Sequence, residues 1–137
     1  MRMTLALLGA AMVITPAAAA PVTMQLDLTG AAEVPEPGDP DGKGTATITI
    51  DSAKPEVCYT LAVSGIDTAT MAHIHKGAAG AAGPPVVTLD PPTEGTSEGC
   101  VTTEAAVVAA ILAKPADYYV NVHNAPHPKG ALRGQLR

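Results

Sequence analysis

Two of the four histidines stand one residue apart, in the stretch "MAHIHKG" at residues 71–77. If this stretch is a β-strand, its side chains alternate between two faces, so His73 and His75 share one face and Ile74 takes the other. Imidazole is a common metal ligand, and two imidazoles on one face can converge on a single ion. The pattern therefore favours a metal site. The alternative is a pair of exposed imidazoles that donate hydrogen bonds to nearby carbonyls.

A second stretch, "YYVNVHN" at residues 118–124, has the same alternation. Val120 and Val122 suit a hydrophobic core, so Asn121 and His123 are predicted on the outer face. His123 is thus a candidate third ligand for an ion held by the first pair.

The fourth histidine, His127, lies between two prolines in "APHPKG" and is a candidate fourth ligand, although a solvated surface histidine would look the same. Glycines at 77, 80 and 83 follow the first histidine pair and would let the chain wrap over a site. Calcium and magnesium prefer oxygen ligands, whereas three or four imidazoles suit copper or zinc. The predicted cofactor is one copper ion, with zinc as the alternative.

Most other segments read as short β-strands. "TATITID" at residues 45–51 alternates strictly, and "PVTMQLDLTG" and "VCYTLAVSGI" repeat the pattern. The residues predicted to face inward in these three segments are Val22, Met24, Leu26, Leu28, Ala46, Ile48, Ile50, Val57, Tyr59, Leu61 and Val63. Clusters of proline and glycine separate the strands, as expected for turns.

One helix is expected, in "TTEAAVVAAILAKP" at residues 102–115. Thr102 or Thr103 is the predicted N-cap, Glu104 lies in the first turn, and Pro115 ends the helix. Many short strands with one short helix predict an all-β fold, an antiparallel Greek-key β-sandwich.

The N-terminus has the features of an export signal. Arg2 precedes the apolar run "LALLGAAMVI", and the small residues of "TPAAAA" follow it. The predicted division is a signal peptide over residues 1–19 and a single domain over residues 20–137. The apolar run is short for a membrane span, so the protein is expected to be exported, either periplasmic or secreted. The alternative is that the segment is retained as an N-terminal anchor.

Export bears on the two cysteines and on the charge. An oxidising compartment favours a disulfide between Cys58 and Cys100, and the alternative is a thiolate ligand or nucleophile.

The exported chain would be acidic. Of the 8 basic residues, 7 remain once Arg2 is removed, and with 13 acidic residues the formal net charge is −6. This acidic balance argues against nucleic acid or an anionic membrane as partner.

The stretches "AHIHKGAAGAAGPPVVTL" and "YYVNVHNAPHPKGALRGQL" together resemble the CHRD domain, first defined in chordin and common in exported microbial proteins. The resemblance runs from about Leu26 to Leu136. It implies a β-sandwich and suggests extracellular binding, but it implies no firm activity. Ala131 departs from the pattern, because the family often carries an acidic residue there.

The arrangement is also similar to that of copper-zinc superoxide dismutases, which are Greek-key β-sandwiches with a His-x-His strand pair. By this likeness His73 and His75 match the strand pair, His123 is the third ligand, and Arg133 is the arginine beside the copper. The zinc loop of those enzymes has no counterpart here, which implies a copper-only site. Arg133, alternating with Leu132, is predicted on the exposed face, where it would attract superoxide; alternatively it forms a salt bridge that ties down the last strand.

The leading hypothesis is therefore an exported copper protein with superoxide dismutase-like activity. A copper or zinc carrier is the second hypothesis, and there His127 would saturate the fourth position. A third is an adhesion or ligand-binding domain, in which the histidines only organise a loop. A zinc hydrolase with three histidines and a water is also conceivable, but no proton-transfer partner is evident.

Overall fold

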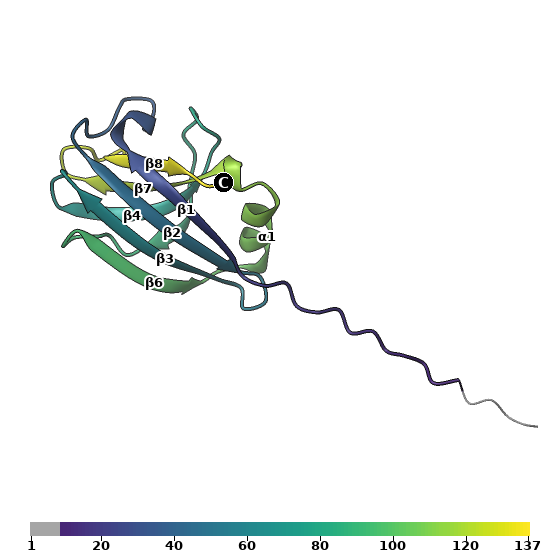
Figure 1. The fold of residues 1–137 in the computed structure, drawn as a ribbon. Helices are drawn as coiled ribbons and strands as arrows, with labels where there is room; N and C mark the ends of the chain where they lie inside the picture. The colour runs from purple at the N-terminus through teal and green to yellow at the C-terminus, as the bar shows by residue number, and fades with distance from the viewer. Residues whose placement is uncertain (1–8) are drawn as a thin grey trace, which may run out of the picture.

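Eight antiparallel strands form one continuous sheet in the computed structural model, which describes residues 9–137 (Figure 1). The strands are β1 (Val22–Thr29), β2 (Lys43–Asp51), β3 (Glu56–Ser64), β4 (Ala69–Lys76), β5 (Pro85–Leu89), β6 (Thr96–Thr102), β7 (Tyr118–Asn124) and β8 (Leu132–Gln135). The helices are α1 (Ala105–Ala113) and two short 3₁₀ turns, η1 (Gly30–Ala32) and η2 (Pro115–Asp117).

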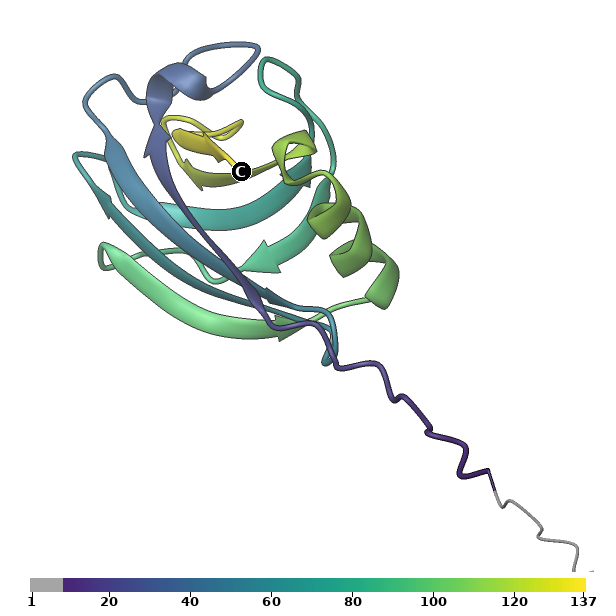
Figure 2. The ribbon, with the colours of Figure 1, turned by 45° about the vertical axis from the view of Figure 1, so that its right-hand side comes forward.

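The strand order in the sheet is β5-β4-β7-β8-β1-β2-β3-β6, so connections such as β3–β4 and β5–β6 cross from one half to the other. The sheet curls until its edge strands, β5 and β6, approach each other. Beside this closure the N–H of Asp90, just after β5, donates a hydrogen bond to Tyr59 Oη, on β3, at 2.9 Å. Helix α1 lies beside the open side of this curved sheet (Figure 2). The predicted all-β antiparallel fold with one helix is confirmed. The two layers of the predicted sandwich are the two halves of one curved sheet.

The core fills the inside of the curved sheet and follows the predicted alternation. Ile74, Val120 and Val122 are each 0% exposed. Of the residues predicted to face inward, the buried ones are Met24, Leu26, Leu28, Ala46, Ile48, Ile50, Val57, Tyr59 and Leu61. Val63 is half-buried, and Val22 is 44% exposed because it begins β1, where the N-terminal segment leaves the domain.

Helix α1 begins later than predicted. Glu104 is its N-cap, without a side-chain capping hydrogen bond, so the assignment of Thr102 or Thr103 as N-cap is wrong. Thr102 is still part of β6, and the Thr103 N–H donates to the Pro55 carbonyl at 3.3 Å. Both threonines are therefore held by the sheet and its flanking turn. Pro115 follows the helix as predicted and begins the 3₁₀ turn.

The predicted disulfide between Cys58 and Cys100 is confirmed. The two residues are direct partners in the pairing of β3 with β6, so the bridge fastens the edge strand to its neighbour. The cysteines are 42 residues apart, and closing a loop of this size in the unfolded chain stabilises the folded state by roughly 4 kcal/mol.

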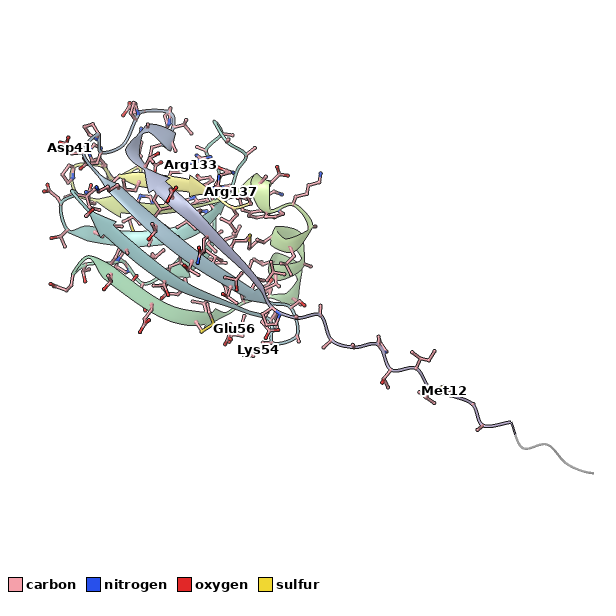
Figure 3. All side chains as sticks on the ribbon, in the orientation of Figure 1. Met12, Asp41, Lys54, Glu56, Arg133 and Arg137 are labelled. Atoms are coloured by element: carbon pink, nitrogen blue, oxygen red, sulfur yellow. A yellow bond between two sulfur atoms is a disulfide. The ribbon has the colours of Figure 1, made fainter. Side chains whose placement is uncertain are left out.

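Before β1 the chain runs away from the domain. Residues 9–21 have no regular secondary structure and are exposed, and Met12 stands clear of the sheet (Figure 3). The first eight residues of the predicted signal peptide lie outside the described residues. Among the helices of residues 9–137, none is long and apolar enough to cross a membrane.

Candidate metal centre

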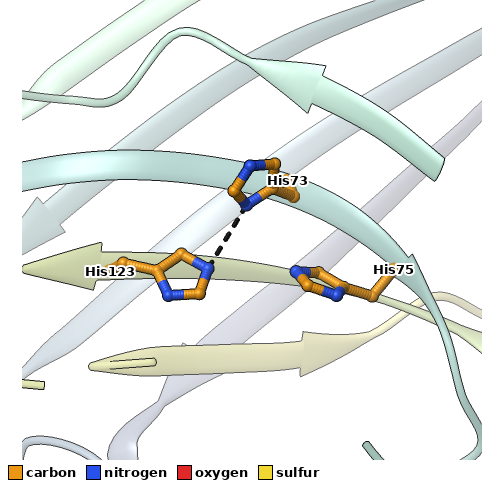
Figure 4. Close-up of side chains that lie close together, drawn as sticks. All are labelled: His73, His75 and His123. Carbon is orange, nitrogen blue, oxygen red and sulfur yellow. Dashed lines mark hydrogen bonds between the residues drawn. The ribbon is translucent and has the colours of Figure 1, made fainter. Parts of the chain in front are cut away.

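Three of the four histidines meet on the outer face of β4 and β7, which are antiparallel neighbours (Figure 4). His73 and His75 project from β4, and His123 projects from β7. One ring nitrogen from each of the three lies within 4.8 Å of the others. The predicted cluster of three imidazoles is therefore present.

Backbone carbonyls fix the orientation of two of the rings. His75 Nδ1 lies 2.8 Å from the Gly83 carbonyl oxygen, and His123 Nδ1 lies 3.0 Å from the Pro128 carbonyl oxygen. Because a carbonyl only accepts, Nδ1 carries the proton in both rings, and Nε2 keeps its lone pair. This is the usual arrangement around metal-ligating histidines, whose second nitrogen donates to a carbonyl or carboxylate.

The spacing of the ring nitrogens suits a metal ion. His73 Nδ1 lies 3.3 Å from His123 Nε2, and the two form the hydrogen bond drawn in Figure 4, which an ion bound between them would replace. Two nitrogens bound at 2.0–2.1 Å to a tetrahedral ion are about 3.3–3.4 Å apart. His75 Nε2 is buried and has no hydrogen-bond partner, a costly arrangement unless something binds it. The three side chains therefore fit one ion with nitrogen-preferring chemistry.

Protonation of His73 and His123 does not compete with a metal at neutral pH. Burial lowers the pKa of His73, and positive charge on His123 or His75 would lower it further. Burial also lowers the pKa of His123. The hydrogen bond to the Pro128 carbonyl raises this pKa by a smaller amount, and positive charge on His75 would lower it further. Both rings are thus neutral near pH 7, the form in which imidazole binds metals.

The cluster is less exposed than an outer-face position suggests. His75 is 8% exposed and His123 is 7% exposed. The glycine-rich segment 77–84, hereafter the covering segment, folds back over β4. Gly80 has a φ of +80°, and a Cβ on Gly83 would collide with the Lys76 carbonyl oxygen, so both positions require glycine. The segment contacts the cluster at His75, whose Nδ1 lies 2.8 Å from the Gly83 carbonyl oxygen.

Arg133 is buried, at 1% exposed, so its predicted place on an exposed surface is wrong. The central carbon of its guanidinium lies 3.5 Å from the centre of the Tyr119 ring. The Tyr119 ring stacks on the ring of His75, with 4.9 Å between the ring centres and 5° between the ring planes. The three side chains form a continuous stack that ends on a candidate ligand. Among the described residues, no carboxylate lies within salt-bridge distance of Arg133, so the alternative ion pair is not formed either.

Arg133 also holds the covering segment. Its Nη2 donates to the carbonyls of Ala78 and Ala81, both at 2.9 Å. Gln135 Nε2 donates to the Gly77 carbonyl at 2.7 Å. Neither Gln135 nor Tyr119 was among the residues predicted for the site, although the alternation that places Asn121 and His123 outward also places Tyr119 on the outer face.

His127 does not join the cluster. Its Nε2 lies 4.0 Å from Asp39 Oδ2, and its backbone N–H donates to Asn124 Oδ1 at 2.9 Å. In residues 9–137 no fourth histidine, cysteine or carboxylate completes the group of His73, His75 and His123.

A buried acid lies close to the site. Glu33 is 5% exposed, and burial raises its pKa from 4.5 to about 7, against the lowering effects of an Asn121 hydrogen bond and the charge of Arg133. Gly130 covers this carboxyl so closely that a Cβ there would overlap it. Asn121, which Glu33 contacts, is the direct partner of both His73 and Arg133 in the sheet, so Glu33 adjoins the row that carries the candidate ligands.

The shifted pKa of Glu33 predicts a pH-dependent stability. The folded protein holds this proton more tightly than the unfolded chain, so the stabilisation is complete below pH 4.5 and is lost as the pH rises through about 7. The loss amounts to at most about 3 kcal/mol. Glu33→Gln is therefore expected to be more stable than the wild type at pH 8, with little difference at pH 4.5.

Urea unfolding of the metal-free proteins at both pH values measures this difference. The lowered histidine pKa values give the opposite slope, stability falling as the pH drops below about 6.5. They act in both proteins and cancel in the comparison. An equal change with pH in wild type and variant would contradict the assignment to Glu33.

A family model of the CHRD domain matches residues 24–136, nearly all of the domain. None of the curated proteins or solved structures compared with the chain is significantly similar to it. By the match over residues 24–136, the chain belongs to the CHRD domain family.

Proposed function

We propose that this CHRD domain binds one copper ion through His73, His75 and His123 and acts in an exported, periplasmic or secreted protein. The observation that carries the proposal is the convergence of three ring nitrogens within 4.8 Å. Two of the rings are held by carbonyls in the tautomer that a metal requires. Copper binds such nitrogen sites more tightly than zinc in the general order of affinities, and zinc remains the alternative ion.

We further propose a superoxide dismutase-like activity for the copper form. Copper alternates between Cu(II) and Cu(I), so it can take an electron from one superoxide and give it to a second, which with two protons yields O₂ and H₂O₂. Three histidines leave a position for a small oxidant, since His127 is engaged elsewhere. The proposed role of Arg133 is to attract the anion by its positive charge, because its guanidinium stacks on Tyr119, which in turn stacks on His75.

The activity is tested by comparing copper-loaded with zinc-loaded protein in a superoxide dismutation assay. The copper form is expected to exceed an equal concentration of free copper in chelating buffer, and the zinc form to be inactive because zinc has no accessible second oxidation state. A copper-loaded protein without activity would favour the carrier. A protein that binds neither metal would favour an adhesion or ligand-binding domain.

A further inference from the structure

A methionine stands next to the three histidines on the same face of the sheet. Met71 precedes His73 by two residues on β4, and strand alternation puts both on the outer face. In the pairing of β4 with β7, the direct partner of Met71 is His123. Met71 is therefore adjacent to one candidate ligand along its strand and to another across the sheet.

The exposure of Met71 has no packing explanation. Its side chain is 47% exposed, and the other large apolar side chains exposed among residues 9–137 all lie in the N-terminal segment or at the start of β1. The pairing of β4 with β7 is irregular between Ala69 and Met71, so two steps on β4 oppose one on β7. Such bulges redirect side chains and are frequent next to functional sites.

We propose that Met71 supplies a thioether ligand to the copper ion, an inference that rests on the copper site proposed above. Directly paired residues have Cβ atoms about 4.5–5.5 Å apart, and the long, flexible methionine side chain can span that distance. Thioether sulfur is a soft ligand that selects Cu(I), whereas zinc in such sites takes nitrogen, thiolate or carboxylate ligands. Met71 would thus give a site of three imidazoles a preference for Cu(I).

A thioether does not close the site to an oxidant. Methionine sulfur is a weak and distant ligand in blue-copper sites, where it takes an axial position. The sulfur would therefore hold Cu(I) firmly and Cu(II) loosely, which leaves room for a small molecule on the oxidised ion. The same property would serve a Cu(I) carrier.

Methyl NMR of the full chain tests this ligand directly. The protein is labelled with ¹³C-methyl methionine and titrated with Ag(I), a diamagnetic substitute for Cu(I), and Met71→Leu assigns the signal. The Met71 methyl is expected to shift and to saturate at one equivalent, together with the ring protons of His73, His75 and His123. Met24, which is 5% exposed in the core, is the internal control and should not shift.

Competition with a Cu(I) chelator gives a second readout. Met71→Leu keeps the size and apolar character of an exposed side chain, so the fold should survive, while Cu(I) affinity should fall about tenfold or more and zinc affinity should not change. Met24→Leu is the matched control and should retain Cu(I) affinity. Histidine shifts without a Met71 methyl shift would overturn the thioether ligand alone. No shift in either set would overturn the metal site and this ligand with it.

Discussion

Replacing His73 with alanine is expected to lower copper affinity by more than about 100-fold while the domain stays folded. Loss of a hydrogen-bond partner behind a metal ligand already costs about 10–100-fold in metal affinity, so loss of a ligand itself must cost more. His73 is the best of the three to replace, because it is only half-buried, whereas His75 stacks on Tyr119 and His123 is 7% exposed. Isothermal titration in the presence of a competing chelator measures the change.

His127→Ala is the matched control. It removes an imidazole that lies outside the cluster, so copper affinity is expected to stay within about twofold of the wild type, and circular dichroism should show the same thermal transition for both variants. Equal affinities for His73→Ala and wild type would contradict the three-histidine site. Equal losses in both variants would indicate nonspecific binding by surface imidazoles.

Ile74→Asp is expected to have the opposite effect and to unfold the domain. Ile74 lies between His73 and His75 but faces inward, at 0% exposed, and its partners on the neighbouring strands are Val87 and Val120, both buried. An unpaired carboxylate among these side chains has no hydrogen-bond partner, and the cost exceeds about 4 kcal/mol. This is a large part of the stability of a domain of this size.

Denaturant unfolding followed by circular dichroism measures the effect, with Thr60→Asp as control. Thr60 lies in the middle of β3 on the exposed face and pairs directly with Glu98, so the same charge placed there should cost at most about 2 kcal/mol, from like-charge repulsion and lower strand propensity. A folded Ile74→Asp protein of near wild-type stability would show that Ile74 does not face the core. The face assigned to both neighbouring histidines would then be wrong as well.

The site could be anticipated from the sequence as far as local alternation reaches. In β4 the core position of Ile74 determines the face of His73 and His75, and in β7 the valines do the same for His123. Which strands become neighbours is decided by nonlocal pairing, and β4 and β7 are separated by β5, β6 and α1 along the chain. The meeting of the three rings was therefore a hypothesis until the pairing was known.

Burial of the site could not be read from strand alternation. Alternation puts Arg133 on the outer face, but the covering segment buries it and accepts its hydrogen bonds. Glu33 lies just after the 3₁₀ turn η1, and only tertiary packing brings it beneath Gly130. The misplaced N-cap has a similar cause, since Thr103 is hydrogen-bonded to the turn before β3. In each case a contact between distant segments overrides the local pattern.

The central claim, that three imidazoles hold one copper ion, is tested most directly by electron paramagnetic resonance of the Cu(II) form with metal analysis of the same sample. We predict one copper per chain and a single Cu(II) species whose hyperfine structure shows coupling to imidazole nitrogen, both lost in His73→Ala and retained in His127→Ala. Copper well below one equivalent, or a spectrum that is the same in His73→Ala as in the wild type, would contradict the claim.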